Sequence, residues 1–314
     1  MPEPDLSVVL AAEDAGTLER GLKALAAQTG RERIELVLVS LSGEPFEVDP
    51  SELDAFAGLR LVHTAAGASL AEGRALGVRA ASGRYVHLGE THAFPHPEWA
   101  ELIIESIDPK WTAIVAGIEN ANPEGAISWA NLLIDYGRWS TDLPGGEIDS
   151  TPPYNTAFER SFALRALEVS SDAFAPGFDL TGLLRREGLR ILFQPTARIS
   201  HVNVSVAAHW LGQRYTAARM RAGMRCRSWP LYRRLGYAIG SPLIPLVLAV
   251  RLAPIVGTVR RARRLPPLTI PAILVGLAAV ACGELAGFVG GEDSEVVRRA
   301  DSFELYKVRY TTMS

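Results

Sequence analysis

The sequence predicts an α/β fold with a mostly parallel central sheet flanked by helices, followed by a C-terminal helical region that associates with a membrane. Two observations predict this. Short apolar runs alternate with helical segments early in the chain, and long uncharged stretches lie among many arginines later. Strands that alternate with helices form parallel βαβ units, whose sheet is covered on both faces. We expect two domains, residues 1–204 and residues 205–314.

The elements of the first domain follow from the spacing of apolar residues. Strands are expected over residues 6–12, 34–39, 59–62, 84–88 and 111–117, and helices over residues 16–28, 68–81 and 97–107. The less regular stretch 119–204 contains strand-like pieces at 154–158 and 190–193 and a helix over 179–187. Ligands of such sheets bind beyond the carboxyl ends of the strands. The polar residues that follow the first, second and fourth strands are therefore the candidates for a site.

Composition excludes several classes of protein. The 314 residues are 48% hydrophobic and 21% charged, which excludes a disordered or fibrous chain. Cys226 and Cys282 are too few for a disulfide framework, and no zinc-binding spacing occurs. The N-terminus has no basic stretch followed by an apolar one, so no signal peptide is expected. We therefore expect the catalytic part to be cytoplasmic.

The C-terminal region is both basic and apolar. Residues 205–264 contain twelve arginines and no Asp, Glu or Lys, although the whole chain has a net charge of −3. The stretches 235–250 and 265–283 carry no charge, but they contain prolines and are short or barely long enough for the roughly 20 residues of a spanning helix. Crossing by the first stretch would also carry the arginines at 260–264 across, against the positive-inside tendency.

We therefore expect peripheral or re-entrant helices at the cytoplasmic face of the cell membrane, with arginines on an anionic lipid surface. A soluble helical subdomain with an apolar core has the same composition and stays an alternative. The basic helix expected over residues 206–227 shows no recognised nucleic-acid-binding pattern, so we expect no nucleic acid partner.

Five segments carry a family resemblance. They are SVVLAAED (7–14), IELVLVSLSG (34–43), the block ASLAEGRALGVRAASGRYVHLGETHAFPHPEW (68–99), YNTAFERSFALRAL (154–167) and FDLTGLLRREGLRILFQPTARISH (178–201). In this order, over about residues 5–204, they resemble the successive blocks of family 2 glycosyltransferases with a GT-A (Rossmann-like) fold. The resemblance implies transfer of a sugar, with inversion, from a nucleotide-diphosphate sugar to a lipid-linked or cell-surface glycan acceptor. Such transferases serve the biosynthesis of cell-envelope polysaccharides.

The resemblance also implies the residues that bind the donor. Ala11, Glu13 and Ser40 would line the pocket of the base, and Arg74 would reach the nucleotide, where a guanidinium fork suits a diphosphate. Asn155 matches a position near the acceptor or the donor sugar. The family commonly has an acidic pair after the second strand, and this sequence has Ser40 and Leu41 instead.

The metal motif departs from the family. An Asp-x-Asp usually holds a divalent cation after the fourth strand, and here the motif is Glu90, Thr91 and His92. His201 matches a histidine that often closes the conserved region, so Glu90, His92 and His201 are the expected ligands. The metal would be Mn²⁺ or Mg²⁺, and nitrogen ligands favour Mn²⁺. The alternative is a decayed motif with two surface histidines.

The expected general base is also altered. The family supplies it from a Glu-Asp pair, whose positions are occupied here by Pro176 and Gly177. Asp172 and Asp179 are the nearest carboxylates, and we take Asp179 as the candidate base, although it also suits a helix cap. An anionic acceptor, such as a lipid phosphate, would need no strong base. The alternative function is therefore a catalytically inert GT-A-like protein that binds at the membrane.

Overall fold

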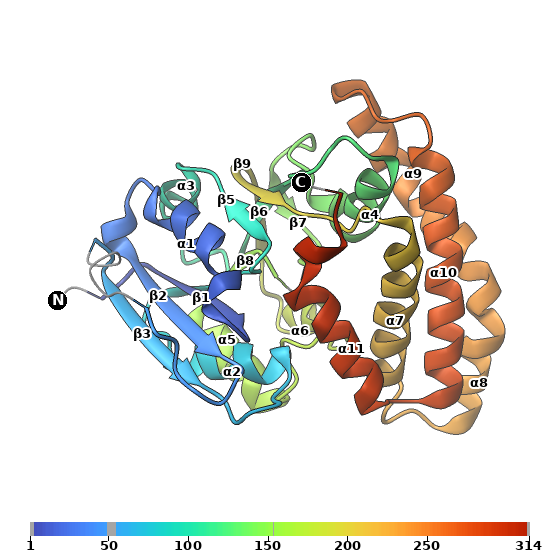
Figure 1. Ribbon diagram of the computed structural model, residues 1–314, viewed down its shortest axis with the longest axis horizontal. Helices are drawn as coiled ribbons and strands as arrows, with labels where there is room; N and C mark the ends of the chain where they lie inside the picture. Colours follow the sequence, from blue (N-terminus) through green and yellow to red (C-terminus); the bar gives the residue numbers. More distant parts are fainter. Residues whose placement is uncertain (1–2, 49–54, 153, 313–314) are drawn as a thin grey trace. The chain divides into compact units, whose positions relative to one another are not determined.

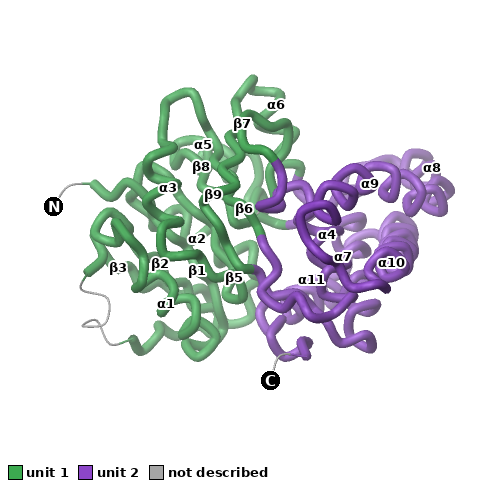
Figure 2. The backbone as a smooth tube through the Cα atoms, turned by 90° about the horizontal axis from the view of Figure 1, so that it is seen from above, with its two compact units in different colours: residues 1–118, 144–175, 179–200 green, residues 119–143, 176–178, 201–314 purple. Residues whose placement is uncertain are grey.

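The computed structural model describes residues 3–48, 55–152 and 154–312. The chain forms two units, which Figure 2 shows in two colours. The first contains residues 1–118, 144–175 and 179–200, and the second contains residues 119–143, 176–178 and 201–314. The domain boundary expected at residues 204–205 stays a prediction.

A mixed sheet forms the centre of the first unit (Figure 1). Its strands are β1 (Leu6–Ala12), β2 (Ile34–Ser40), β3 (Gly58–His63), β4 (Tyr85–Leu88), β5 (Ala93–Pro95), β6 (Ala113–Asn120), β7 (Gly146–Ile148), β8 (Thr156–Glu159) and β9 (Ile191–His201). The order is β3-β2-β1-β4-β8-β6-β9-β5, and β7 pairs with β9. The first four strands in this order are parallel, whereas β8 runs antiparallel to both β4 and β6.

Helices cover both faces of this sheet. They are α1 (Glu19–Ala26), α2 (Leu70–Ala80), α3 (Trp99–Glu105), α5 (Arg160–Val169) and α6 (Leu180–Arg186), of which α2 and α5 lie on one face and α1 and α3 on the other (Figure 1). A capping box between Ser69 and Glu72 starts α2. A Cβ at Gly77 would lie 2.3 Å from Val9 Cγ1, so only glycine allows α2 to approach β1 this closely. All residues of β1 and β2 are buried, as expected for strands covered on both faces.

The expected α/β architecture is confirmed. All five strands expected in the first 117 residues are present, as are the helices expected over 68–81, 97–107 and 179–187. The helix expected over 16–28 is shorter, because Asp14 first caps the 3-10 turn η1 (Ala15–Thr17). Other 3-10 turns in the described residues are η2 (Arg31–Arg33), η4 (Gly137–Trp139), η5 (Ser241–Leu243) and η6 (Lys307–Tyr310). Described elements without an expectation of their own are β5, β7, α5, the helix α4 (Ala126–Tyr136) and the helix α11 (Ser294–Leu305).

The second unit is helical. Besides α4 it contains α7 (Ala207–Arg225), α8 (Leu231–Gly240), α9 (Ile244–Ala262), α10 (Thr269–Gly290) and α11 (Ser294–Leu305). Helix α10 packs against α7 and α4 through glycines. A Cβ at Gly283 would lie 2.3 Å from the Tyr215 carbonyl oxygen, and one at Gly287 would lie 2.4 Å from the Arg219 carbonyl oxygen. Small residues at such positions let two helix backbones approach closely.

Many large apolar side chains of α8, α9 and α10 are exposed. Of the exposed large apolar residues that the structure describes, most lie between Leu231 and Val289, including Ile239 at 80% exposure and Leu246 at 65%. Single exposed apolar side chains are ordinary, but a continuous set marks an interaction surface. One side of these helices therefore packs on protein, with Val259 and Leu277 fully buried, while another side exposes leucines and valines.

Two helical segments among the described residues are long and apolar enough to cross a membrane. They are Leu231–Ala262 and Thr269–Gly290, which contain 18-residue windows with mean hydropathies of 1.9 and 2.1. Helix α10 continues beyond the uncharged stretch 265–283 to Gly290 and tolerates Pro271 in its first turn. Length alone therefore does not exclude a spanning segment.

Candidate functional site

The carboxyl ends of β1 and β2 gather the residues expected to line the base pocket. In the parallel register Ala11 pairs with Val39 and Ala12 pairs with Ser40, so Ala11 and Ser40 lie at the same edge of the sheet. Both residues are buried, and the Ser40 hydroxyl lies 2.8 Å from the Ser42 hydroxyl. Glu13 follows β1 and is exposed. A polar edge of this kind is where doubly wound sheets bind ligands.

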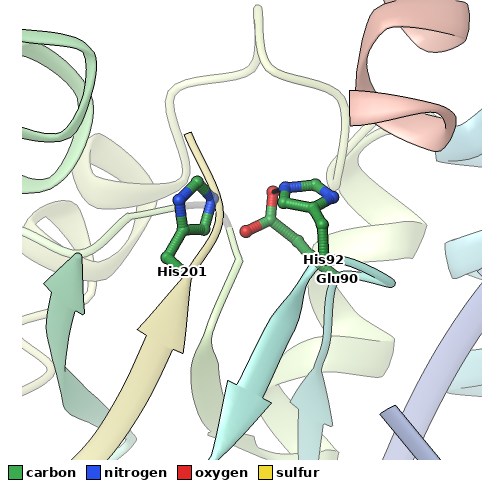
Figure 3. Close-up of side chains that lie close together, drawn as sticks. All are labelled: Glu90, His92 and His201. Carbon is green, nitrogen blue, oxygen red and sulfur yellow. Dashed lines mark ion pairs between the residues drawn. The ribbon is translucent and has the colours of Figure 1, made fainter. Parts of the chain in front are cut away.

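Three expected metal ligands converge (Figure 3). Glu90 and His92 lie in the turn after β4, and His201 is the last residue of β9. One ligand atom from each lies within 4.8 Å of the others, and all three side chains are buried. Glu90 Oε1 lies 3.7 Å from His92 Nε2, and Figure 3 shows the Glu90 carboxylate facing His201. The alternative of two surface histidines is therefore wrong, because His92 and His201 are both buried.

Asn203 fixes the orientation of His201. The Asn203 Nδ2 amide donates to Asn120 Oδ1 at 3.0 Å and to the His201 carbonyl at 2.9 Å. Its Oδ1 must therefore be the atom that faces His201 Nδ1 at 3.1 Å, and it accepts the Nδ1 proton. The lone pair then lies on His201 Nε2. Metal-binding histidines are commonly oriented by such a hydrogen bond from the other ring nitrogen.

Asn155 holds the carboxylate of Glu90. Its Nδ2 donates to Glu90 Oε2 at 2.6 Å, and its backbone N–H donates to the Leu88 carbonyl at 2.7 Å. Asn155 has φ 56° and is the one non-glycine residue with positive φ in the described ranges. Asparagine adopts this left-handed conformation more easily than most residues, and such strained positions cluster at functional sites. Asn155 therefore combines a left-handed backbone conformation with a hydrogen bond to one of the candidate ligands.

Arg74 is buried in α2, with 3% of its surface exposed. Its guanidinium carbon lies 3.4 Å from the centre of the Tyr154 ring, and its Nε has no hydrogen-bond partner within the described residues. Cation–π contact stabilises the charge of a buried guanidinium but satisfies none of its N–H donors. A buried arginine with an unused donor suits an anionic ligand such as a diphosphate.

The donor set of Glu90, His92 and His201 fits a divalent cation. One carboxylate and two imidazoles match the ligands of Mn²⁺ and similar metals better than those of Mg²⁺, which prefers oxygen. Metal–ligand bonds of about 2.1 Å bring two ligand atoms on one ion roughly 3–4 Å apart, so the side chains need to move only slightly. Metal binding at these residues stays a prediction.

Asp179 is the N-cap of α6. Its Oδ1 accepts from the Gly182 N–H at 2.8 Å, and the residue is exposed. This is the helix-capping role that competes with the expected role of general base. Asp172, the other nearby carboxylate, is half-buried. The proton-accepting role of Asp179 stays a prediction.

His87 lies in β4, three residues before Glu90, and is fully enclosed. Burial lowers its pKa to about 3, although the charge of Glu90 acts in the opposite direction. Its ring packs edge-on against Trp99 with 4.7 Å between centroids. His87 is therefore a neutral imidazole, an uncharged core residue beside a charged site.

Sequence reasoning missed the residues that support the site. Asn203 and Asn120 orient His201, and Tyr154 lies under Arg74. The Tyr136 ring also contacts His201, with 4.7 Å between centroids. For Asn203 and Tyr154, proximity in the sequence could have indicated a supporting role. Asn203 follows His201 by two residues, and Tyr154 precedes Asn155. The contributions of Asn120 and Tyr136 depend on the tertiary fold.

The fold is GT-A. The chain is similar to the solved structure of the mannosyltransferase PcManGT from Pyrobaculum calidifontis in complex with GDP-Man and Mn²⁺. The TM-score is 0.53 and the identity 17%, over 91% of this chain and 88% of that chain. More remote similarities are to S. aureus TarS in complex with UDP and to GalNAc-T7 with UDP, GalNAc and Mn²⁺.

The TarS similarity has TM-score 0.45 and 12% identity, over 91% of this chain and 92% of that one. The GalNAc-T7 similarity has TM-score 0.46 and 17% identity, over 64% and 44%. No protein-family model matches the sequence. No curated protein matches it at a significant level.

Proposed function

We propose that this protein is a glycosyltransferase that takes a sugar from a nucleotide-diphosphate sugar, with inversion, at the cytoplasmic face of a membrane. The observation that carries the proposal is the convergence of Glu90, His92 and His201 beside Asn155, at the carboxyl ends of parallel strands. The similar mannosyltransferase structure contains GDP-Man and Mn²⁺, which supports a nucleotide sugar and a metal here.

Each residue at this edge has a distinct task in the proposal. Ser40 and Glu13 offer hydrogen-bonding groups to the base and ribose, and Ala11 leaves space for them because its side chain is small. Arg74 pairs with the diphosphate, and the Tyr154 ring keeps the guanidinium plane in place. Asn155 holds the Glu90 carboxylate, and Asn203 keeps the lone pair of His201 on Nε2. A divalent metal bound there would neutralise the negative charge that develops on the leaving nucleotide.

We propose a lipid-linked or cell-surface glycan acceptor. The exposed apolar side chains of α8, α9 and α10 support attachment to an anionic membrane, together with five exposed arginines: Arg233, Arg251, Arg260, Arg261 and Arg264. Five other arginines of residues 205–264 pair with carboxylates instead: Arg214, Arg219, Arg225, Arg227 and Arg263. Each basic residue near such a surface contributes about 1 kcal/mol. An acceptor that is already an anion would also tolerate Pro176 and Gly177 where a base is expected, because no proton has to be removed.

The test is metal-dependent nucleotide binding. We expect UDP or GDP to bind the full-length protein in the presence of Mn²⁺ and to bind at least tenfold more weakly after chelation. His92→Ala should cause a similar loss, because it removes one of three ligands. His209→Ala is the control, because His209 is exposed in α7 and is not among the residues assigned to the site. Equal nucleotide affinity with and without metal would remove the metal from the proposal.

The second candidate is a catalytically inert GT-A-like binding protein. It is favoured by the cap formed by Asp179 and by the two residues that replace the expected base. Donor turnover with membrane lipids supplied separates the two candidates, because only the enzyme releases free nucleotide. Asp179→Asn keeps the cap and removes the base. A fall of more than a hundredfold in turnover would identify Asp179 as the base, and unchanged turnover would favour an anionic acceptor.

A further inference from the structure

The second unit contains an open groove formed by α7, α8, η5, α9 and α10. It has a volume of about 600 Å³, within the range of small-molecule binding sites. Its apolar walls are Tyr237, Leu243, Ile244, Val247 and Leu248. Leu243 is 63% exposed and Val247 is 44% exposed, so these walls are open rather than packed on protein. We call this the α8–α10 groove.

Three arginines lie at the α8–α10 groove: Arg225, Arg233 and Arg251. One carboxylate, Glu284, lines it with them, and no other does among the residues the structure describes. Glu284 pairs with Arg225 at 3.1 Å. The groove therefore carries a net charge of about +2 on an otherwise apolar surface, which favours an anionic ligand.

The combination of an apolar channel and an excess of guanidinium groups specifies one kind of ligand. Free phosphate would leave the apolar walls exposed, and a neutral hydrocarbon would leave Arg233 and Arg251 without an anion. A lipid with a phosphate group satisfies both surfaces. The neighbouring side chains Ile239 and Val250, at 80% and 66% exposure, extend the apolar surface toward a bilayer from which such a lipid would come.

We propose that the α8–α10 groove binds one lipid phosphate, with the hydrocarbon chain against Leu243 and Val247 and the phosphate at Arg233 and Arg251. The proposal extends the membrane attachment under "Proposed function", on which it rests. A phosphomonoester carries about −1.5 to −2 charges at neutral pH, which matches the net charge of the groove better than a diester does. The net charge of the groove is about +2 rather than +3, because Glu284 neutralises Arg225.

The test uses the full-length protein in a non-ionic detergent and counts bound molecules by native mass spectrometry. The probe is monododecyl phosphate, compared with dodecanol and with inorganic phosphate. We expect one monododecyl phosphate per chain, bound at least tenfold more tightly than either comparator. The double variant Arg233→Gln, Arg251→Gln should lose at least tenfold in affinity, whereas the matched variant Arg260→Gln, Arg261→Gln should not.

A second variant tests the groove without changing its charge. Gly236 lines the groove, and a Cβ there meets no atom within 4 Å, so we expect the ring of Gly236→Phe to occupy the groove and displace the lipid. Gly212→Phe is the matched control, since a Cβ at this α7 glycine also meets nothing within 4 Å and Gly212 does not line the groove.

Three results would overturn the proposal. The first is binding of monododecyl phosphate to Gly236→Phe and to the double arginine variant as tightly as to the parent. The second is equal affinity for dodecanol. The third is a dimer of the parent that Gly236→Phe dissociates, which would make a second copy the occupant. Nucleotide affinity, measured in the same variants, separates the outcomes: retained nucleotide binding with lost lipid binding leaves the glycosyltransferase proposal intact.

Discussion

Protonation of His87 should make the stability of the protein depend on pH. The folded pKa is about 3, because the imidazole is fully buried, and the ordinary value is 6.5. The folded pKa is depressed, so the folded chain stays neutral at His87 while the unfolded chain binds a proton as the pH falls below about 6.5. Stability due to this residue is therefore complete above pH 6.5 and is lost progressively toward pH 3.

The magnitude follows from proton linkage. Between pH 7 and pH 5 the unfolded chain gains most of one proton at His87 and the folded chain gains almost none, which lowers the free energy of unfolding by about 2 kcal/mol. This is a large part of the stability of an ordinary domain. This pH range lies above the range in which most carboxylates titrate, so the effect of His87 on stability can be distinguished from theirs.

The assay is urea unfolding of the parent, His87→Leu and the exposed control His63→Gln at several pH values between 7 and 5. The Leu variant should be shifted in absolute stability, because it loses the edge-on contact with Trp99. Between pH 7 and pH 5, its free energy of unfolding should nevertheless fall by about 2 kcal/mol less than that of the parent. The slope of the control should match that of the parent. An identical slope in His87→Leu and the parent would show that His87 is protonated in the folded protein and would refute the reasoning.

Three further predictions concern the site and the helical unit. Arg74→Lys should weaken nucleotide binding about tenfold in a titration, because lysine lacks the planar fork that stacks on a ring and pairs with phosphate. Asn203→Leu should weaken Mn²⁺ affinity about tenfold to a hundredfold, measured by electron paramagnetic resonance, because His201 loses the partner of Nδ1. Gly283→Leu should destabilise the helical unit by about 1–3 kcal/mol or more in thermal unfolding, and Gly257→Leu, which has open space, should not.

The parallel half of the sheet could be predicted from sequence because its signals are local. Strands β1 and β2 are continuous apolar runs, and α2 begins with a capping box. The antiparallel half gave weaker signals. Strands β5 and β7 have three residues each and are defined by pairing with distant segments, so no local pattern marks them.

The sequence anticipated which three side chains converge, but not the residues that support them. Glu90 and His92 were expected from the resemblance and from their position after the fourth strand, and His201 from the resemblance alone; the topology brings all three together. The role of Asn203 depends on which of its amide atoms faces the His201 ring. The hydrogen bond to Asn120, more than eighty residues away in the sequence, decides this orientation. Asp179 shows the opposite limit, because its capping bond forms within four residues and was expected from the sequence alone.

Three departures from the pattern of the family that the sequence resembles agree with the anionic acceptor proposed above. The replacement of a metal-motif carboxylate by His92 removes one negative charge from the site. At about 8 Å and an effective dielectric constant of about 20, this lowers the repulsion on an approaching phosphate by roughly 2 kcal/mol. Pro176 and Gly177 remove two further carboxylates. An alcohol acceptor gains nothing from these changes and loses its base, whereas a phosphate acceptor needs no base and gains access. A survey of acceptors should therefore favour lipid phosphates over neutral glycolipids, and the reverse order would contradict this reasoning.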